Sequence, residues 1–400
     1  MLNTTESQEP AGLDYPGDLL GFADALTGPE RAKLAVLREH LEARVRPLLI
    51  PAWEAGECPA EIRAPLAALR LEDDPDLVGD DGRPSALYQG FKTVELSRLD
   101  LGVSIIYGGQ VGMFRTLVLE GGSPEQIAAW DPDILAFRKT GCFALTEPDH
   151  GSDIAGGLST TARRTEDGWV LNGNKRWIGN ATLSDELCVI AREERGSRVL
   201  AFLVPAAAPG VQLSVISNKA ALRHVHNADI SLRDVFVPDS ARLPRIESFR
   251  DINRAFRTLR PVIAWNAVGM QLGAYDAALR HAKERVQFGS PIAGFQMIQE
   301  KLVQIVANIA QTLALAVRTA THPVSDDVSA SLIKLVAADR LRESVALARE
   351  IVGGDGLLLQ NDVIRFFADA EAMYTFEGTR EVNVLIVGRD LTGISAFTRG

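Results

Sequence analysis

Six short runs decide the fold class, and all lie between residues 141 and 238: GCFALTEP (141–148), GWVLNGNKRWIG (168–179), ELCVIARE (186–193), RVLAFLVP (198–205), VQLSVIS (211–217) and DISLRDVFVP (229–238). Each run is rich in β-branched and aromatic residues and is bounded by turn-forming residues, which is the pattern of β-strands. The pair Asn172-Gly173 divides the second run. Because both residues tolerate positive φ, we expect a hairpin turn there. Evenly spaced strands of this kind predict a small antiparallel barrel or sandwich.

Helical patterns flank this β region on both sides. Before it, apolar residues recur at helical spacing over residues 31–45 and 86–119. After it, a bundle seam with spacings of three and four runs through Phe295, Ile298, Leu302, Ile305, Ile309, Leu313 and Val317, and residues 330–352 and 363–373 continue the pattern. We therefore predict an α+β fold of three parts: an N-terminal helical domain (1–138), a central β domain (139–245) and a C-terminal helical bundle (246–400).

Composition and charge narrow the class of protein. The net charge of −10 argues against a nucleic-acid binder, which normally carries a basic face. Cysteines 58, 142 and 188 have no metal or disulfide spacing, which predicts a reducing compartment. The first 18 residues lack the basic and apolar regions of a signal peptide. The uncharged stretch between Lys301 and Arg318 is interrupted by polar residues, so we expect a core-facing helix, no membrane span, and a cytoplasmic protein.

Several residues are candidates for chemistry when taken alone, and each has a plain structural alternative. Thr146 and Ser152 lie in the loop of FALTEPDHGSD (143–153), where hydroxyls and free amides hold a polar ring or a phosphate, or only satisfy their own turn. Trp177 is a wall for a flat cofactor or a core residue. Arg285 ends a long helix and either grips a diphosphate or favours the helix C-terminus. Glu377, beside Gly378 between two helical stretches, is a general base or a solvated loop residue.

Other familiar sites are absent from the sequence. His224 and His226 would share a face of a strand, but no third ligand joins them at a recognised spacing, so we favour a structural role. There is no P-loop, and no GxGxxG occurs where a strand meets a helix. The Gly353-Gly354-Asp355-Gly356 run follows a helix and does not qualify. The sequence therefore predicts neither a metal centre nor a Rossmann dinucleotide site.

Five segments, in this order, resemble the signatures of the acyl-CoA dehydrogenase family: FALTEPDHGSD (143–153), NGNKRWIGNA (172–181), ERVQFGSPIAGFQMIQEKL (284–302), GGDG (353–356) and MYTFEGTREVNVLIVGRDLTG (373–393). The resemblance runs from about residue 85 to the end, and its C-terminal run is most similar to the glutaryl-CoA dehydrogenase branch. It implies a helical domain, a β domain and a four-helix bundle, with FAD between the last two. It also implies a homotetramer or a dimer in which FAD is contacted by both subunits.

The resemblance assigns roles to residues by their place in the motifs. It implies that FAD contacts Phe143, Leu145, Thr146, Ser152, Trp177, Ile178 and Gly179, that Arg285, Phe288, Gln296, Gly353 and Gly354 contact the FAD of the partner subunit, and that Thr379 and Glu381 lie on the flavin side. The acyl-CoA is expected to contact Ser152, Arg260 and Gly378. Glu377 is expected to remove the α-proton while flavin N5 takes the β-hydride, which yields a 2,3-enoyl-CoA. Electrons would leave through an electron-transfer flavoprotein, in a role in fatty acid metabolism.

The chain departs from the family pattern at a few positions. Some members carry the base immediately before the position of Arg260, but Leu259 stands there and cannot accept a proton. The branch's arginine for a distal substrate carboxylate is replaced by Ser104, so glutaryl-CoA is disfavoured because a buried carboxylate needs a cation. Gly179 replaces a threonine near flavin N5. The Asp149-His150 pair and Arg257 are also atypical, and the sequence offers no account of them.

Other readings stay open. An acyl-CoA oxidase or a flavin-dependent monooxygenase would keep the same fold and change the electron acceptor. Glu377 favours α-proton chemistry, while Gly179 leaves room for oxygen near the flavin. A non-catalytic protein that binds acyl-CoA is a third reading. The thioester could also be carried on a protein-bound pantetheine, and neither chain length nor branching of the acyl group follows from the sequence.

Overall fold

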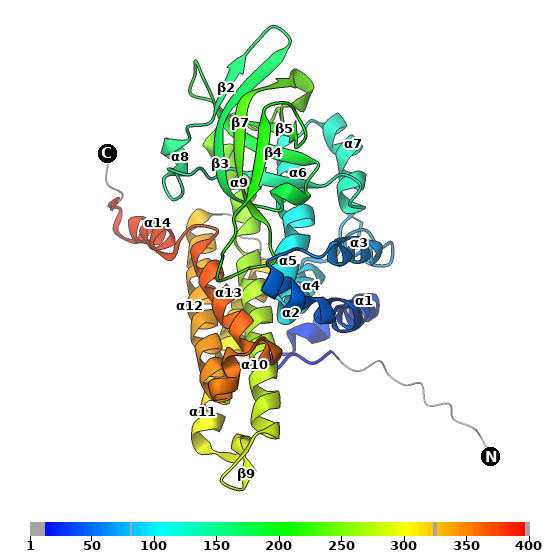
Figure 1. Ribbon diagram of the computed structural model, residues 1–400, viewed down its shortest axis with the longest axis vertical. Coiled ribbons are helices and arrows are strands. Elements are labelled where there is room, and N and C mark those ends of the chain that lie inside the picture. The colour runs from blue at the N-terminus through cyan, green and yellow to red at the C-terminus, as the bar shows by residue number, and fades with distance from the viewer. Residues whose placement is uncertain (1–12, 81, 323–325, 397–400) are drawn as a thin grey trace, which may run out of the picture.

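The computed structural model describes residues 13–80, 82–322 and 326–396, and the predicted order of helices, strands and helices is confirmed (Figure 1). Most of the segment expected not to be a signal peptide lies outside the described residues. The N-terminal part contains α1 (Gly28–His40), α2 (Arg46–Ala55), α3 (Ala60–Ala68), α4 (Ala86–Leu99), α5 (Leu101–Gly108), α6 (Arg115–Gly121) and α7 (Pro124–Leu135), with single π-helical turns between α1 and α2 and between α5 and α6.

Asp100 divides the helical pattern that the sequence suggested over residues 86–119. Its backbone is extended, with φ −169° and ψ 132°. Its carboxylate accepts hydrogen bonds from the amides of Gly102 and Val103, at 2.8 and 3.3 Å. An aspartate in this position caps a new helix by satisfying its free N–H groups. The pattern therefore forms three helices and a π turn instead of one long helix.

The central part is one curled sheet of strands β1 (Gly141–Ala144), β2 (Thr161–Arg164), β3 (Gly168–Gly179), β4 (Glu186–Glu193), β5 (Val199–Pro205), β6 (Val211–Val215) and β7 (Asn227–Pro238), with a short helix α8 (Ile154–Gly157). The strand order is β1-β4-β2-β3-β7-β6, and β5 pairs with β4. The prediction of an antiparallel barrel or sandwich was wrong in one respect, because β4 pairs parallel with both β1 and β2. The chain crosses over between these strands, so the sheet is mixed.

The hairpin predicted at Asn172-Gly173 was also wrong, because β3 runs straight through these residues. β3 pairs with β7 along most of its length, and its register shifts between Leu171 and Gly173. Gly173 has φ 150°, and a Cβ there would meet Thr160 Oγ1 at 2.5 Å. Long-range pairing with β7 outweighs the local preference of Asn172-Gly173 for a turn. The result is a β-bulge within β3 instead of a hairpin.

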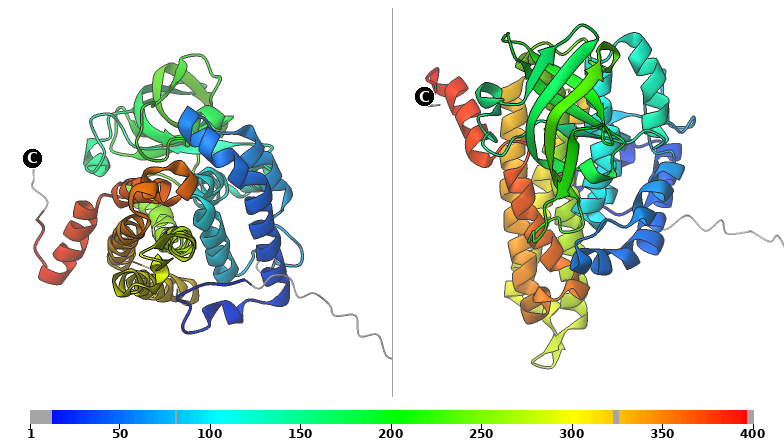
Figure 2. Two further views of the ribbon diagram at one scale, coloured as in Figure 1. Left: turned by 60° about the horizontal axis from the view of Figure 1, so that its bottom comes forward. Right: turned by 45° about the horizontal axis from the view of Figure 1, so that its top comes forward.

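The C-terminal part contains α9 (Phe249–Leu259), α10 (Val262–Glu284), α11 (Gln296–Thr321), α12 (Asp327–Val352), α13 (Val363–Thr375) and α14 (Arg380–Thr392), with a small hairpin of β8 (Val286–Gln287) and β9 (Ser290–Pro291). Helix α10 packs against α4, α11, α12 and α13, so the bundle and the N-terminal part share one hydrophobic core. Helix α14 contacts α12 and projects from the rest of the molecule (Figure 2). The sheet lies at one end of the bundle and the β8–β9 hairpin at the other (Figure 1).

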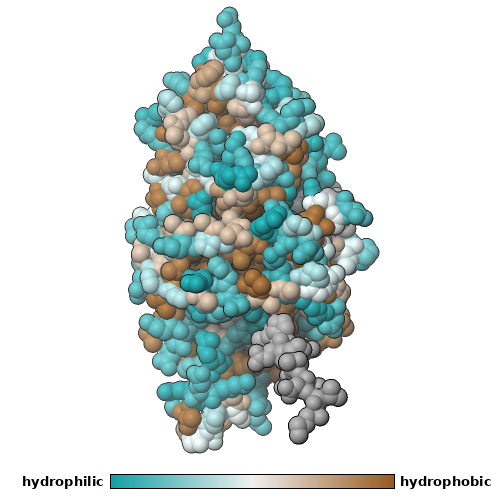
Figure 3. All heavy atoms as spheres, turned by 90° about the vertical axis from the view of Figure 1, so that its right-hand side faces the viewer, coloured by the Kyte–Doolittle hydropathy of each residue, from teal (hydrophilic) through white to brown (hydrophobic). Residues whose placement is uncertain are grey.

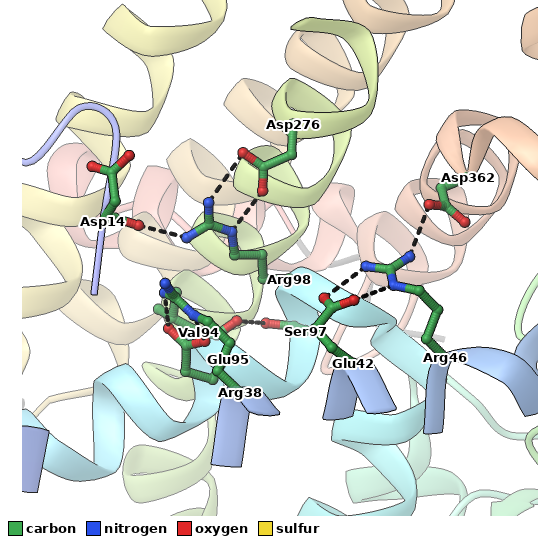
Figure 4. Close-up of polar contacts among 10 residues, drawn as sticks. All are labelled: Asp14, Arg38, Glu42, Arg46, Val94, Glu95, Ser97, Arg98, Asp276 and Asp362. Carbon is green, nitrogen blue, oxygen red and sulfur yellow. Dashed lines mark hydrogen bonds and ion pairs between the residues drawn. The ribbon is translucent and has the colours of Figure 1, made fainter. Parts of the chain in front are cut away.

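Ion pairs reinforce the contact between the N-terminal helices and the bundle (Figure 4). Arg98 on α4 binds Asp276 on α10 through two hydrogen bonds of 2.6 and 3.0 Å. Arg46 on α2 reaches Asp362 at the start of α13, at 2.9 Å. On the face of the N-terminal helices, hydrophobic residues are interspersed with hydrophilic ones (Figure 3). The two ion pairs join α4 to α10 and α2 to the start of α13.

Helix α11 is long and apolar enough to cross a membrane when only length and composition are counted, and 39% of its most apolar window is buried. Helices of soluble bundles pass the same test. In this fold the buried side of α11 packs between α10 and α12.

Cys142 and Cys188 are buried and Cys58 is partly buried, and all three are free thiols. The boundaries at residues 138 and 245 stay predictions, although β1 begins at Gly141 and α9 at Phe249.

Candidate active site

The segment that follows β1 is fastened to β3 by backbone and side-chain hydrogen bonds. Thr146 donates its hydroxyl to the carbonyl of Arg176 at 2.6 Å, and the Arg176 amide donates to the Thr146 carbonyl at 2.8 Å. The ammonium of Lys175 donates to the Leu145 carbonyl at 2.9 Å and to Glu147 at 2.8 Å. Leu145 is buried, whereas Phe143 and Thr146 are partly exposed. The segment is therefore rigid and still presents side chains to a ligand.

The end of β3 presents an aromatic surface beside this segment. Trp177 has φ 63° and leaves 54% of its surface exposed, although its neighbour Ile178 is buried. The next residue, Gly179, is partly exposed, and Asn180 also has a positive φ. Asn180 donates from its side chain to the Ile106 carbonyl at 3.1 Å, which anchors the end of the strand to α5. A fixed indole with an open face is suited to stacking against a flat ring.

Glu377 lies on the turn between α13 and α14, where the sequence predicted it. Its φ is 56°, and Gly378 follows with φ 83°. Burial raises the pKa of the Glu377 carboxyl, while the positive charges of Arg260 and Lys334 oppose that rise. Left-handed backbone is strained for a residue with a Cβ, and such strain concentrates at functional sites. A partly desolvated carboxylate held in a fixed turn has the properties of a general base.

Arg260, whose charge acts on Glu377, is linked to the β domain by aromatic contacts. The ring of Phe143 on β1 lies 6.0 Å from the ring of Phe256 on α9, and Arg260 lies over Phe256 at 5.4 Å. The Nε of Arg260 is buried and has no hydrogen-bond partner in the described part of the chain. Because a buried donor needs a partner, this guanidinium is available to a ligand that binds between the β domain and the bundle. Leu259 beside it is buried and apolar.

The loop after β1 contains the remaining expected substrate contact. Ser152 is exposed there, and His150 holds the loop through a 2.9 Å contact from its Nδ1 to Asp153. His150 also packs on Gly157, where a Cβ would meet the imidazole at 2.1 Å. Asp149 is exposed and makes no such contact. His150 thus has a structural role in shaping the loop.

The two atypical positions in the helices have definite partners. Ser104 on α5 is buried and donates its hydroxyl to Asn266 Oδ1 on α10 at 2.6 Å. The Asn266 amide donates to the Val262 carbonyl at 3.3 Å, so this polar pair is neutral and internally bonded. Arg257 on α9 pairs with Asp327 on α12 at 3.1 Å. Arg257 therefore joins the two helices.

A second group of expected cofactor residues lies at the other end of the bundle. It comprises Arg285, Phe288, Gln296, Gly353 and Gly354, all of which are exposed. Phe288 leaves 96% of its surface exposed, and no atom would obstruct a Cβ at Gly353 or Gly354. Figure 1 shows this end, with the β8–β9 hairpin, far from the sheet. A single chain does not bring these residues to Trp177.

The last two expected residues flank the turn of Glu377. The hydroxyl of Thr379 accepts the Val382 amide at 3.3 Å and caps α14, while Glu381 is exposed in the first turn. The residues present fit FAD in two respects: an exposed indole for the ring and an unobstructed Gly-Gly turn. The individual contact roles stay predictions.

Sequence reasoning missed three residues that shape the site: Lys175, Glu147 and Lys334. Each ionisable side chain is almost completely buried. The only feature of the sequence that could have indicated these buried residues was a charge at a position where the helical or strand pattern places apolar residues. His224 is also buried and contacts Asp100 at 3.1 Å, which agrees with its expected structural role. No metal-binding cluster of His, Cys, Asp and Glu occurs among the described residues.

Comparison with known proteins identifies relatives along most of the chain. Two family models match: the acyl-CoA dehydrogenase middle domain at residues 142–235 and the acyl-CoA dehydrogenase C-terminal domain at residues 249–392. The human mitochondrial short-chain specific acyl-CoA dehydrogenase is 32% identical over 330 residues, which cover 80% of this chain and 79% of that protein. The CarC subunit of the caffeyl-CoA reductase-Etf complex of Acetobacterium woodii is 31% identical over 84% of this chain and 90% of its own.

Among solved structures, a glutaryl-CoA dehydrogenase from Mycobacterium smegmatis in complex with FADH2 superposes with a TM-score of 0.89 and 29% identity. The superposition covers 96% of this chain and 100% of that one. The likeness therefore extends over the helical N-terminal part, the sheet and the bundle together.

Proposed function

This chain belongs to the acyl-CoA dehydrogenase family and binds FAD, and we propose that it dehydrogenates an acyl-CoA thioester between C2 and C3 with Glu377 as the base. The observation that carries the proposal is the environment of Glu377. Its carboxyl is held on a left-handed turn, its pKa is raised by burial, and two cations oppose that rise. A general base needs to be basic enough to take a proton and still be ionised at the working pH.

The residues divide the work as follows. Glu377 removes the α-proton of the thioester, whose acidity depends on stabilisation of charge at the carbonyl oxygen. The backbone amides of the strained turn are the donors that we assign to that oxygen. Arg260 and Ser152 bind the acyl-CoA, and the rigid segment of Phe143 to Thr146 with Trp177 orients the cofactor. Bound FAD supplies an acceptor for the β-hydride at N5. Closure of the site by substrate excludes water.

We propose a monocarboxylic acyl group as the substrate. The Ser104–Asn266 pair is neutral, and both polar groups are already bonded to protein. A second carboxylate placed there would have no cation to offset its desolvation, which costs several kcal/mol. Glutaryl-CoA and its decarboxylation are disfavoured for this reason.

The proposal includes partners. An electron-transfer flavoprotein is the proposed acceptor, in line with the relative that is a subunit of a complex with Etf. A homo-oligomer, a tetramer or a dimer, is proposed because the second group of cofactor residues lies far from the first and includes the exposed Phe288. Helix α14 also leaves Leu391 79% exposed. A role in fatty acid metabolism in the cytoplasm stays a prediction.

One observation favours a second candidate, an acyl-CoA oxidase. A Cβ at Gly179 would meet only Asn227 Nδ2, at 3.7 Å, so the space beside the expected flavin edge is open. If oxygen uses that space, flavin reduced by substrate will be reoxidised rapidly in air. In Gly179→Thr the new Cβ meets no described atom closer than Asn227 Nδ2, and the added side chain should occupy this space and slow the reoxidation. Unchanged reoxidation in this variant would count against the oxidase candidate.

An anaerobic spectral titration tests the main proposal. The flavin of the wild-type protein is titrated with straight, branched, aromatic and dicarboxylic acyl-CoAs, alongside Glu377→Gln. Bleaching by monocarboxylic thioesters that is lost in the variant is expected, since removal of a general base typically costs about 10²–10⁴ in rate. A flavin that no thioester bleaches would refute the proposed reaction.

A further inference from the structure

A buried ammonium group binds the backbone of the turn that contains Glu377. Lys334 belongs to α12 and is 0% exposed. Its Nζ donates to the Tyr374 carbonyl at 2.7 Å and to the Gly378 carbonyl at 2.8 Å. In the described part of the chain, it forms no ion pair with an Asp or Glu side chain. Burying a cation with only neutral acceptors is costly, so a lysine at this position calls for a reason.

The two carbonyls that Lys334 binds lie on either side of Glu377. The Tyr374 carbonyl belongs to the last turn of α13, where helix carbonyls lack partners within the helix. The Gly378 carbonyl comes directly after the base. The ammonium thus binds both ends of the segment 374–378. The residues with left-handed backbone, Glu377 and Gly378, lie within this segment. Left-handed backbone at a non-glycine residue persists only when its surroundings hold it.

We propose that Lys334 is a positioning residue for the base: its ammonium clamps the carbonyls of Tyr374 and Gly378, holds Glu377 in its left-handed turn, and favours the ionised carboxylate. The inference rests on the proposed function, because it takes Glu377 as the base. It adds a second task for Lys334, which is to supply a positive charge that opposes the rise in the Glu377 pKa caused by burial.

The charges around Lys334 support this role. The negative charges that act on its ammonium are Glu377 on the turn, Glu381 on α14 and Asp339 on α12, and Arg260 opposes them. Burial still prevails and lowers the pKa of Lys334 to about 8. The group is therefore charged at neutral pH. In turn, the Lys334 charge opposes the rise in the pKa of Glu377, second only to that of Arg260.

The turn has a second anchor, which makes a variant at Lys334 testable. The side-chain amide of Asn383 donates to the carbonyls of Gly378 and Thr379, both at 2.9 Å. Lys334→Met keeps the length and apolar stem of the side chain and removes the charge with its donors. Because Asn383 remains, we expect the variant to fold with a displaced turn.

Arg342 provides a matched control. It lies two turns further along α12, pairs with Glu371 on α13 at 2.8 Å, and lies over the Tyr374 ring at 4.3 Å. Arg342→Met thus removes a cation from the same helix–helix contact without touching the carbonyls of the turn. Its charge is not among those that shift the pKa of Glu377.

The test is the pKa of the Glu377 carboxyl, followed by infrared difference spectroscopy over a pH titration with Glu377→Gln as the blank. In Lys334→Met we expect this pKa to rise because an opposing positive charge is gone, and the acid limb of kcat/KM to move with it. In Arg342→Met neither should move. The rate of flavin reduction in a single turnover should also fall by about 10- to 100-fold in Lys334→Met because the base is misplaced. An unchanged Glu377 pKa in Lys334→Met would overturn the inference.

If Lys334→Met fails to fold, the reciprocal measurement on Lys334 still tests the inference. The ammonium of Lys334 is titrated by NMR in the wild type and in Glu377→Gln. We expect a lower Lys334 pKa in the variant because the negative charge with the largest effect on it is gone. An equal pKa in both proteins would overturn the inference. Since neither titration needs turnover, a shifted pKa together with an unbleached flavin would refute the proposed reaction and leave the contact standing. Bleaching with unshifted pKa values would refute the role of Lys334 alone.

Discussion

The variant Lys175→Met tests whether a buried ion pair holds the flavin-facing segment in place. Lys175 and Glu147 have side-chain exposures of 0% and 1%, and their charged atoms lie 2.8 Å apart. Glu147 also accepts the amides of Ser159 and Thr160, at 2.7 and 2.9 Å. The ammonium donates to the Leu145 carbonyl at 2.9 Å. Removing the lysine therefore leaves a buried carboxylate with neutral donors and removes one of the bonds that hold the segment to β3, while the Thr146–Arg176 bonds remain.

The expected magnitude follows from the two pKa shifts. Burial opposes ionisation of Glu147, but Lys175 and the hydrogen bonds outweigh it and lower its pKa from 4.5 to about 2. Burial lowers the pKa of Lys175 from 10.5 to about 8. At about 1.4 kcal/mol per unit, each shift of about 2.5 units corresponds to ~3–4 kcal/mol, the first favouring folding and the second opposing it. The intact pair is thus near neutral in free energy, and breaking it should cost about 3–5 kcal/mol.

Thermal unfolding and flavin release measure this cost. For a chain of 400 residues, an unfolding entropy of roughly 2 cal/mol/K per residue converts it to a fall in Tm of about 4–6 °C. The temperature at which flavin fluorescence appears should fall at least as far, since the loosened segment is proposed to contact the cofactor. The double variant Lys175→Met with Glu147→Gln should recover part of the loss, because no charge remains buried. A fall in Tm below about 1 °C, or a double variant no more stable than the single one, would refute the reasoning.

Two further predictions concern the core and the pH dependence of stability. In Gly90→Ala the new Cβ would meet the Trp265 ring at 2.3 Å, so we expect a loss of about 1–3 kcal/mol by thermal unfolding, whereas Gly112→Ala, where nothing lies within 4 Å, should lose none of this packing. Burial and the charge of Asp100 raise the pKa of Asp369 from 3.8 to about 7, beside His224 and Arg365. An acid whose folded pKa is raised gives stability that is lost as pH rises from its unfolded pKa to its folded one. Asp369→Asn should therefore flatten the fall in the urea midpoint between pH ~4 and ~7, and an identical pH dependence in both proteins would contradict this.

The parts of the fold that were predictable depend on local patterns. The seam from Phe295 to Val317 repeats at helical spacing, and α11 spans it. The turn of Glu377 was predictable because Gly378 interrupts two helical runs. The parallel pairing of β4 with β1 and β2 was not predictable, since it depends on contacts between residues more than 20 apart in sequence. Asn172-Gly173 shows the same limit, because pairing with β7 decides its conformation.

The site was predictable only as far as motifs extend. The resemblance pointed to Trp177, Arg260 and Glu377, and the structure links Arg260 to Phe143 through Phe256. The family motifs did not indicate which residues position Trp177, Arg260 and Glu377. Arg285 and Gly353 lie at the far end of the bundle, away from the sheet (Figure 1). Sequence reasoning therefore names candidate groups more readily than the scaffolding that orients them.

Lys175 and Lys334 show why that scaffolding was hidden. Both are buried, both donate to backbone carbonyls, and burial lowers the pKa of each to about 8. Each carbonyl lies in a loop, a turn or the last turn of a helix, where the regular hydrogen bonds of helices and sheets leave carbonyls without partners. An ammonium has three donors and a flexible stem, so it can satisfy two such carbonyls at once. In sequence these lysines look like solvated residues. Only the fold reveals that they brace the two turns on which the proposed chemistry depends.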